Sequence, residues 1–264
     1  MRWICSVALV LSLGAAGFAQ EPDAAAPAAP APGKADRSAA AERAVQKWAA
    51  FSAKGADWRV SWNAKTGLPR MIYGDKTKPY AGSPSEAAQA FLEENAELVG
   101  VPAAAVAKAG PAGAAAGGKA PGEMAAQPPA VELRKAAEAE ILNGTRVTFQ
   151  QYCHGIPVFN AECIVCVDGA GAIWHVANSV HPDLSADVAA FEGAKGLGLW
   201  MARSEFDGNA PQVRGEPERV IYPAGTGTPA LRFTCRFGDG RELWQVVLDA
   251  VTGDELRKVR LVLD

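Results

Sequence analysis

The stretch over residues 145–160 constrains the fold more than any other part of this chain of 264 residues. It reads Thr-Arg-Val-Thr-Phe-Gln-Gln-Tyr-Cys-His-Gly-Ile-Pro-Val-Phe-Asn, so two runs rich in apolar residues flank a Gly-Ile-Pro turn. Alternation of apolar and polar residues is typical of half-buried strands, and Gly with Pro marks a turn. The stretch therefore predicts a strand, a turn and a second strand.

The beginning of the chain has the pattern of a secretory leader. Arg2 supplies a positive charge, residues 4–17 are apolar, and residues 17–19 (Gly-Phe-Ala) form a small-x-small cleavage site. The apolar run is shorter than the roughly 20 residues that cross a bilayer. We therefore expect a cleaved signal peptide at 1–19, a secreted or periplasmic protein, and no membrane span in the mature chain.

Composition divides the remainder into ordered and low-complexity segments. Residues 20–37 are dominated by Ala and Pro, and residues 103–130 by Ala, Gly and Pro. Such segments cannot bury enough apolar surface to offset their chain entropy, so we expect a linker and a low-complexity insertion. The net charge is only −3 and no Lys/Arg run occurs. Nucleic acid is therefore not an expected partner.

The ordered segments predict helices followed by antiparallel strands. Ser83, Pro84 and Glu86 form a capping box with proline at the first helical position, which predicts a helix that Gly100 ends. The other expected elements are helices at 38–54, 132–142 and 185–201, a hairpin at 57–74, and strands at 172–177, 219–222, 231–237, 243–249 and 256–263. This order favours an α+β fold of antiparallel sheets, each packed with a helix.

Four cysteines follow the leader: Cys153, Cys163, Cys166 and Cys235. In an exported protein they suggest disulfides, with three connectivities open, or buried thiols. Cys163 and Cys166 form a C-x-x-C pair, but in a strand residues three apart point to opposite faces. A shared metal ion or a bridge between these two is therefore disfavoured, and no cofactor is expected.

Two blocks carry a family resemblance. The first spans residues 60–101 and the second residues 144–168. The second block contains the positions Phe149, Gln150, Gln151, Gly155, Pro157 and Val158. Together they resemble the propeptides of fungalysin-like and thermolysin-like metalloproteases. The region from Ser185 resembles a PepSY domain, with Trp244, Asp249 and Gly253 in its terminal motif.

The resemblance implies a propeptide-like fold of two related subdomains. The expected boundaries are 38–102 and 131–182 for the two parts of the propeptide-like domain and 183–264 for the PepSY-like domain. In the resembled family the propeptide assists folding of its protease and holds it inactive. The His-Glu-x-x-His motif of the protease half does not occur in this chain.

Candidate catalytic residues are sparse. His154, His175 and His181 are not spaced four apart on a helix, and no Gly-x-Ser-x-Gly motif occurs. A dyad of Cys153 with a distant histidine has nothing to favour it over a structural thiol. We expect one of the two glutamines, Gln150 or Gln151, to be solvated and the other to bind a loop. The chain is therefore predicted not to be an enzyme.

Three functions fit these expectations. The first is an inhibitor or folding helper that acts in trans on a secreted thermolysin-like metalloprotease, through a strand edge of the C-terminal meander or of the 145–178 sheet. The second is a non-inhibitory extracellular or envelope binding module on the same scaffold. The third is the remnant of a truncated protease precursor.

Overall fold

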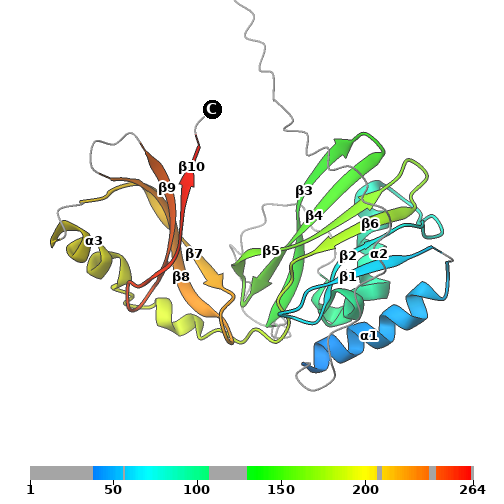
Figure 1. The fold of residues 1–264 in the computed structure, drawn as a ribbon, viewed down its shortest axis with the longest axis horizontal. Helices are drawn as coiled ribbons and strands as arrows, with labels where there is room; N and C mark the ends of the chain where they lie inside the picture. The colour runs from blue at the N-terminus through cyan, green and yellow to red at the C-terminus, as the bar shows by residue number, and fades with distance from the viewer. Residues whose placement is uncertain (1–37, 56, 107–129, 207–209, 238–241, 263–264) are drawn as a thin grey trace, which may run out of the picture.

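The computed structural model describes residues 38–55, 57–106, 130–206, 210–237 and 242–262. The expected signal peptide, the linker before residue 38 and nearly all of the expected insertion lie outside these ranges. Figure 1 shows two groups of strands that diverge from a common base, with helices against the outer side of each group. Among the described residues no helix is long and apolar enough to cross a membrane.

Strands dominate the described part of the chain. They are β1 (Arg59–Trp62), β2 (Pro69–Tyr73), β3 (Val131–Ile141), β4 (Gly144–Cys153), β5 (Ile156–Val167), β6 (Ile173–Asn178), β7 (Gln212–Tyr222), β8 (Thr228–Arg236), β9 (Leu243–Asp249) and β10 (Glu255–Leu261). The helices are α1 (Ala39–Ser52), α2 (Pro84–Val99) and α3 (Gly196–Phe206), with short 3-10 turns η2 (Ala103–Ala105) and η3 (Val188–Phe191).

The strands form one curled, mixed sheet. Its main path runs β1-β2-β6-β5-β7-β8-β9-β10, and the β3-β4 hairpin extends it from β5. The pair β5-β7 is parallel, and it joins the N-terminal strands to the C-terminal strands. The expected α+β fold of separate antiparallel sheets, each packed with a helix, is therefore wrong. The strands form one sheet because β5 pairs with β4 and β6 in one group and with β7 in the other.

The segment expected to be a helix at 132–142 is instead the edge strand β3. Its Ala and Glu residues favour a helix in isolation, but helix propensity is a weak preference that tertiary pairing overrides. β3 pairs with β4 from Val131 to Ile141, with one register shift between Lys135 and Ala137. Leu133 is fully buried in the core beneath this hairpin.

Local signals located two helices correctly. Ser38 caps α1 by accepting a hydrogen bond from the Ala41 amide at 3.3 Å. The predicted capping box of α2 is present between Ser83 and Glu86, and Gly100 ends the helix with φ of 88°. The hairpin predicted at 57–74 is also confirmed, as β1 and β2.

The helix predicted at 185–201 is wrong in its position. The 3-10 turn η3 occupies the first part, capped by Asp187, and α3 begins only at Gly196. The Gly196 amide donates to the carbonyl of Ala250 at 2.8 Å. Contact with the β9-β10 connection, which lies far away in sequence, therefore fixes where α3 begins.

Apolar cores lie between the helices and the strands and at the junction of the two strand groups. Phe91 of α2 is fully buried against Val147, Phe149 and other inward-facing strand residues. Burial of one such side chain contributes about 1.5–3 kcal/mol. On the other group of strands, Trp200 of α3 packs on Phe233.

Candidate functional site

The ladder between β4 and β5 is interrupted at the glutamine pair. The register shifts between Gln150 and Tyr152, so that residues 158–161 of β5 bulge out of the ladder. We call these four residues the junction bulge. Val158, within it, pairs in parallel with Ile221 of β7. The bulge is therefore the point at which the N-terminal strands meet the C-terminal strands.

Gln150 holds the junction bulge from the inside. Its Nε2 lies 2.7 Å from the carbonyl oxygen of Val158 and 3.0 Å from that of Ala161. The same nitrogen lies 2.9 Å from the carbonyl oxygen of Gln151. The side-chain amide thus replaces ladder partners that the bulge removes from these carbonyl groups.

Gln151 performs a similar task on the opposite face of β4. Its side chain is fully buried, its Nε2 donates to the carbonyl of His181 at 2.7 Å, and its Oε1 accepts from the His181 amide at 2.9 Å. Both glutamines therefore bind main chain. The expectation that one of them is solvated does not match this arrangement, because Gln150 is half-buried and bound to carbonyl groups.

The hairpin predicted from residues 145–160 is confirmed, with His154 and Gly155 at its turn. Cys153 pairs with Ile156 across the turn, and φ is 50° at His154 and 79° at Gly155. Two consecutive positive φ angles are typical of the turn that best matches the twist of paired strands. Gly155 relieves the steric cost at the second position.

The remaining positions of the second block lie within strands β4 and β5. Phe149 and Val158 are each 1% exposed, and Pro157 lies near the start of β5.

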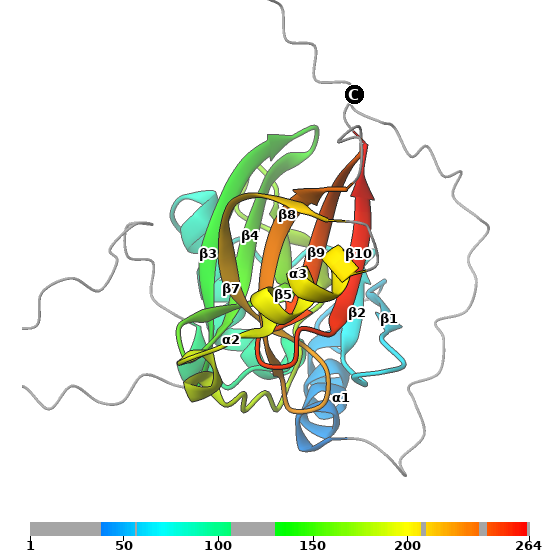
Figure 2. The same cartoon turned by 90° about the vertical axis from the view of Figure 1, so that its left-hand side faces the viewer.

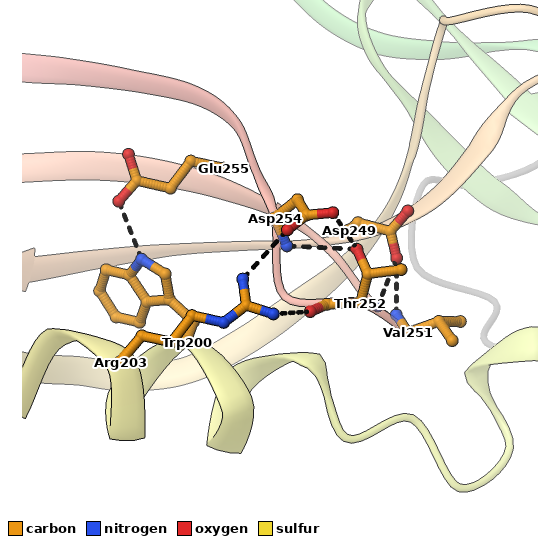
Figure 3. Close-up of polar contacts among 7 residues, drawn as sticks. All are labelled: Trp200, Arg203, Asp249, Val251, Thr252, Asp254 and Glu255. Carbon is orange, nitrogen blue, oxygen red and sulfur yellow. Dashed lines mark hydrogen bonds and ion pairs between the residues drawn. The ribbon is translucent and has the colours of Figure 1, made fainter. Parts of the chain in front are cut away.

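The C-terminal motif residues form a turn that receives the start of α3 (Figure 3). Asp249 Oδ1 accepts hydrogen bonds from the amides of Val251 and Thr252, each at 2.8 Å. Gly253 has φ of 72°, and a side chain there would clash with the carbonyl oxygen of Gly196. The motif therefore brings the β9-β10 turn into close contact with the first turn of the helix.

Two side chains of α3 complete this contact. Trp200 Nε1 donates to Glu255 at 2.8 Å, and Arg203 binds Asp254 at 3.0 Å and the Thr252 carbonyl at 3.1 Å (Figure 3). Trp244 lies half-buried at the far end of the same core, in edge-to-face contact with Phe237.

All four described cysteines carry free, buried thiols. Three of them lie apart in three cores: Cys163 beneath α2, Cys153 near the junction bulge and Cys235 beneath α3. Burial raises the pKa of Cys163 to about 12 and that of Cys235 to about 11. These thiols are therefore protonated at neutral pH and poor nucleophiles.

Cys166 lies on the other face of β5 from Cys163, as expected from their spacing. Its sulfur is 4.0 Å from Nδ1 of His175, and burial raises the pKa of the thiol and lowers that of the imidazole. Both shifts favour the neutral pair. In the described ranges, no three His, Cys, Asp or Glu side chains gather in a way that could hold a metal ion.

The open edges of the sheet lie at its ends. Strands β4, β5 and β6 are each paired on both sides, so the 145–178 strands offer no edge. β3 pairs only with β4 along its length, apart from one bridge between Leu133 and Val106 within the described part of the chain. β1 pairs only with β2 and β10 pairs only with β9, so these two strands end the main path of the described sheet. In Figure 2, β3 lies at the left side of its strand group and β10 at the right side of the β7-β10 group.

One polar cluster was not singled out from the sequence. Tyr80, Glu94 and Asn95 meet between α2 and the segment that follows β2. The available signal was Asn95, an amide within the apolar stripe of a helix.

Comparison with known proteins identifies the class of the central strands. Residues 132–180 match the Fungalysin/Thermolysin Propeptide Motif. The match covers β3 to β6 and the glutamine pair, so this part of the chain carries a propeptide motif. No curated protein matches the chain.

A solved structure also matches this chain. It is the C-terminal domain of YpeB from Bacillus megaterium, with a TM-score of 0.31 and 13% sequence identity. The alignment covers 86% of this chain and 100% of that one.

Proposed function

We propose that this chain is an exported, non-catalytic propeptide-like protein that binds a thermolysin-like metalloprotease in trans, as an inhibitor or a folding helper. The observation that carries the proposal is the propeptide motif over residues 132–180. The leader pattern at 1–19 supports export of the protein to the compartment where secreted proteases of this kind act. The resemblance of the C-terminal strands to a PepSY domain belongs to the same proposal.

The edge strand β3 is the binding element in this proposal. It lies within the matched motif, and its outer side is unpaired from Arg134 onward in the described residues. Ala136, Ala137 and Ala139 are small, so a partner strand can approach the main chain closely.

The edge strand β10 is less suited to strand addition. It carries Arg257, Lys258 and Arg260 within seven residues. Charged side chains on an edge strand oppose pairing with a further strand, and those of β10 are mostly of one sign, whereas β3 carries Arg134 and Lys135 beside Glu138 and Glu140. β10 therefore serves as the comparison edge for experiments.

The test is a titration of residues 20–264 against a thermolysin-like protease that cleaves a small peptide substrate. We expect inhibition that saturates at an equimolar ratio while the inhibitor stays intact. For the folding role, refolding yield of the denatured protease is measured in the same mixtures. Digestion of the protein with neither inhibition nor improved refolding would contradict the proposal.

Proline substitutions test the edge itself. Neighbouring residues of a strand direct their amides to opposite sides, so of Ala139→Pro and Glu140→Pro one removes an amide of the β4 ladder and the other an outward amide. We expect the variant that keeps its stability to lose inhibition. The pair Val259→Pro and Arg260→Pro in β10 is the control. Unchanged inhibition by the stable β3 variant would exclude this edge.

A further inference from the structure

A pocket of about 580 Å³ lies between the end of α1, the second half of α2 and the segment after β2. Its walls include the rings of Phe51, Trp58 and Tyr80. Volumes of this order suit a small ligand, and such sites combine aromatic walls with polar groups that fix the ligand's orientation. The pocket lies outside the residues matched by the propeptide motif.

The floor of the pocket contains an unsatisfied acceptor. Asn95 is 1% exposed, and its Oδ1 has no hydrogen-bond partner. The Nδ2 of the same amide donates to the carbonyl of Phe91 at 2.9 Å, so a flipped amide would set two oxygens against each other. Leaving a buried acceptor unpaired costs about 1–3 kcal/mol. A ligand that donates a hydrogen bond here would recover part of that cost.

The nearby carboxylate is already occupied. Glu94 accepts from the hydroxyl of Tyr80 at 2.8 Å and from Lys54 at 3.1 Å, so each carboxylate oxygen has a partner. Burial, and then the hydrogen bond to Glu94, raise the pKa of Tyr80 well above its usual range. The phenol is therefore neutral at physiological pH and held in place. Glu94 is thus not the group that awaits a ligand.

The rim of the pocket has an excess of positive charge. Three lysines line it, Lys54, Lys76 and Lys78, against the single carboxylate of Glu94. Lys54 pairs with Glu94, and Lys76 pairs with Asp168 at 2.9 Å. Lys78 is exposed and forms no ion pair within the described residues. Among the charged residues that line the pocket, Lys78 is therefore the one without an ion-pair partner in the described residues.

We propose that this pocket binds the carboxyl-terminal residue of a peptide with an apolar last side chain. Such a residue carries a hydrogen-bond donor, a negative charge and an apolar side chain within one small unit. Its amide N–H suits Asn95, its carboxylate suits Lys78, and its side chain suits the rings of Phe51 and Trp58. The proposal does not depend on binding of a protease.

The test is calorimetric or NMR titration of residues 20–264 with N-acetyl-leucine. Two matched probes remove one complement each: N-acetyl-leucinamide lacks the carboxylate, and N-acetyl-N-methyl-leucine lacks the N–H. We expect saturable binding of the first probe and weaker binding of both others. The methylated probe tests Asn95 without a substitution in the buried helix.

A surface substitution tests the rim. We expect Lys78→Gln to weaken N-acetyl-leucine binding by up to about fivefold, the range of an exposed ion pair. Lys65→Gln changes an exposed lysine in the β1-β2 turn, away from the pocket, and should leave binding unchanged.

Three results would overturn the proposal. One is the absence of saturable binding. Another is equal affinity for all three probes, or an affinity of the Lys78→Gln variant for N-acetyl-leucine that equals that of the native protein. The third is tighter binding of leucine itself, which would assign the pocket to a free amino acid.

Discussion

The side chain of Gln151 forms two hydrogen bonds to the main chain of His181, one to its carbonyl and one from its amide. The two residues are 30 positions apart, and they join β4 to the segment that leads from β6 toward the C-terminal strands. The buried side chain of Gln151 therefore supplies the hydrogen-bond donor and acceptor that a neighbouring main-chain segment would supply in a sheet.

Substitution of Gln151 measures this connection. Gln151→Leu keeps the volume but leaves the amide and carbonyl of His181 buried without partners. We expect a loss of roughly 2–4 kcal/mol in the free energy of unfolding, from about 1–3 kcal/mol for each unsatisfied group. Urea unfolding gives the value. Gln212→Leu, at an exposed position of β7, should change it by less than about 0.5 kcal/mol. Equal effects would mean that the bonds to His181 contribute little.

Gly253 and Gly193 separate backbone strain from steric clash. Their φ angles are 72° and 73°, but a side chain at Gly253 meets the Gly196 carbonyl, whereas nothing lies near Gly193. We expect Gly193→Ala to cost about 1–2 kcal/mol for its left-handed backbone and Gly253→Ala to cost more. Thermal unfolding of the two variants compares them. Equal costs would show that the β9-β10 turn can move away from α3.

The pair Tyr80 and Glu94 predicts a dependence on pH. The hydrogen bond from Tyr80, and then the one from Lys54, lower the pKa of Glu94. A carboxyl group with a lowered folded pKa stabilises the fold above its unfolded pKa, and this stabilisation is lost as pH falls through the folded value. We therefore expect Tyr80→Phe to raise the pKa of Glu94. We also expect the difference in free energy of unfolding between the native protein and this variant to be larger at about pH 7 than at about pH 3.

Carboxyl NMR titration and urea unfolding at both pH values test this expectation. Tyr73→Phe is the control, because Tyr73 is 37% exposed and its hydroxyl makes no hydrogen bond in the described part of the chain. A Glu94 pKa unaffected by Tyr80→Phe would contradict the assigned cause.

The cysteines predict a difference in reactivity between the folded and unfolded chain. All four described thiols are buried, and burial raises the pKa of Cys163 to about 12, so iodoacetamide at about pH 8 should leave the folded protein unmodified. After unfolding without a reductant, all four thiols should react. Mass spectrometry counts the modified residues. Two or fewer reactive thiols would indicate a disulfide.

Elements whose signals are local were predictable from the sequence. The capping box of α2 lies within four residues, and Gly155 marks its hairpin turn at the site of the positive φ. In both places the residues that determine the structure are neighbours in the chain. Their physical chemistry can be read without knowledge of the tertiary fold.

Elements that depend on distant partners were not predictable in this way. The Ala and Glu residues of β3 favour a helix, and only the ladder with β4 makes them a strand. The start of α3 depends on the Ala250 carbonyl, which lies more than 50 residues further along the chain. The junction bulge likewise requires a partner strand, β7, that no pattern within β5 indicates.

The pocket residue Asn95 shows the same limit within a site. Its place in the apolar stripe of α2 is visible in the sequence, but the missing partner of its Oδ1 is a property of the assembled fold. An amide among buried residues is a reason to look for a ligand only after its neighbours are known.

The sharing of β5 between both groups of strands governs how the protein can be dissected. Phe159 of the junction bulge is 3% exposed because Tyr222 stacks on it at 5.8 Å and Val220, Ala230 and Val247 surround it. A fragment that ended after residue 182 would release Phe159 and Val158 into water and leave the junction bulge of β5 without its neighbours from β7 to β9. We expect such a fragment to aggregate, whereas one extended through β10 stays monodisperse.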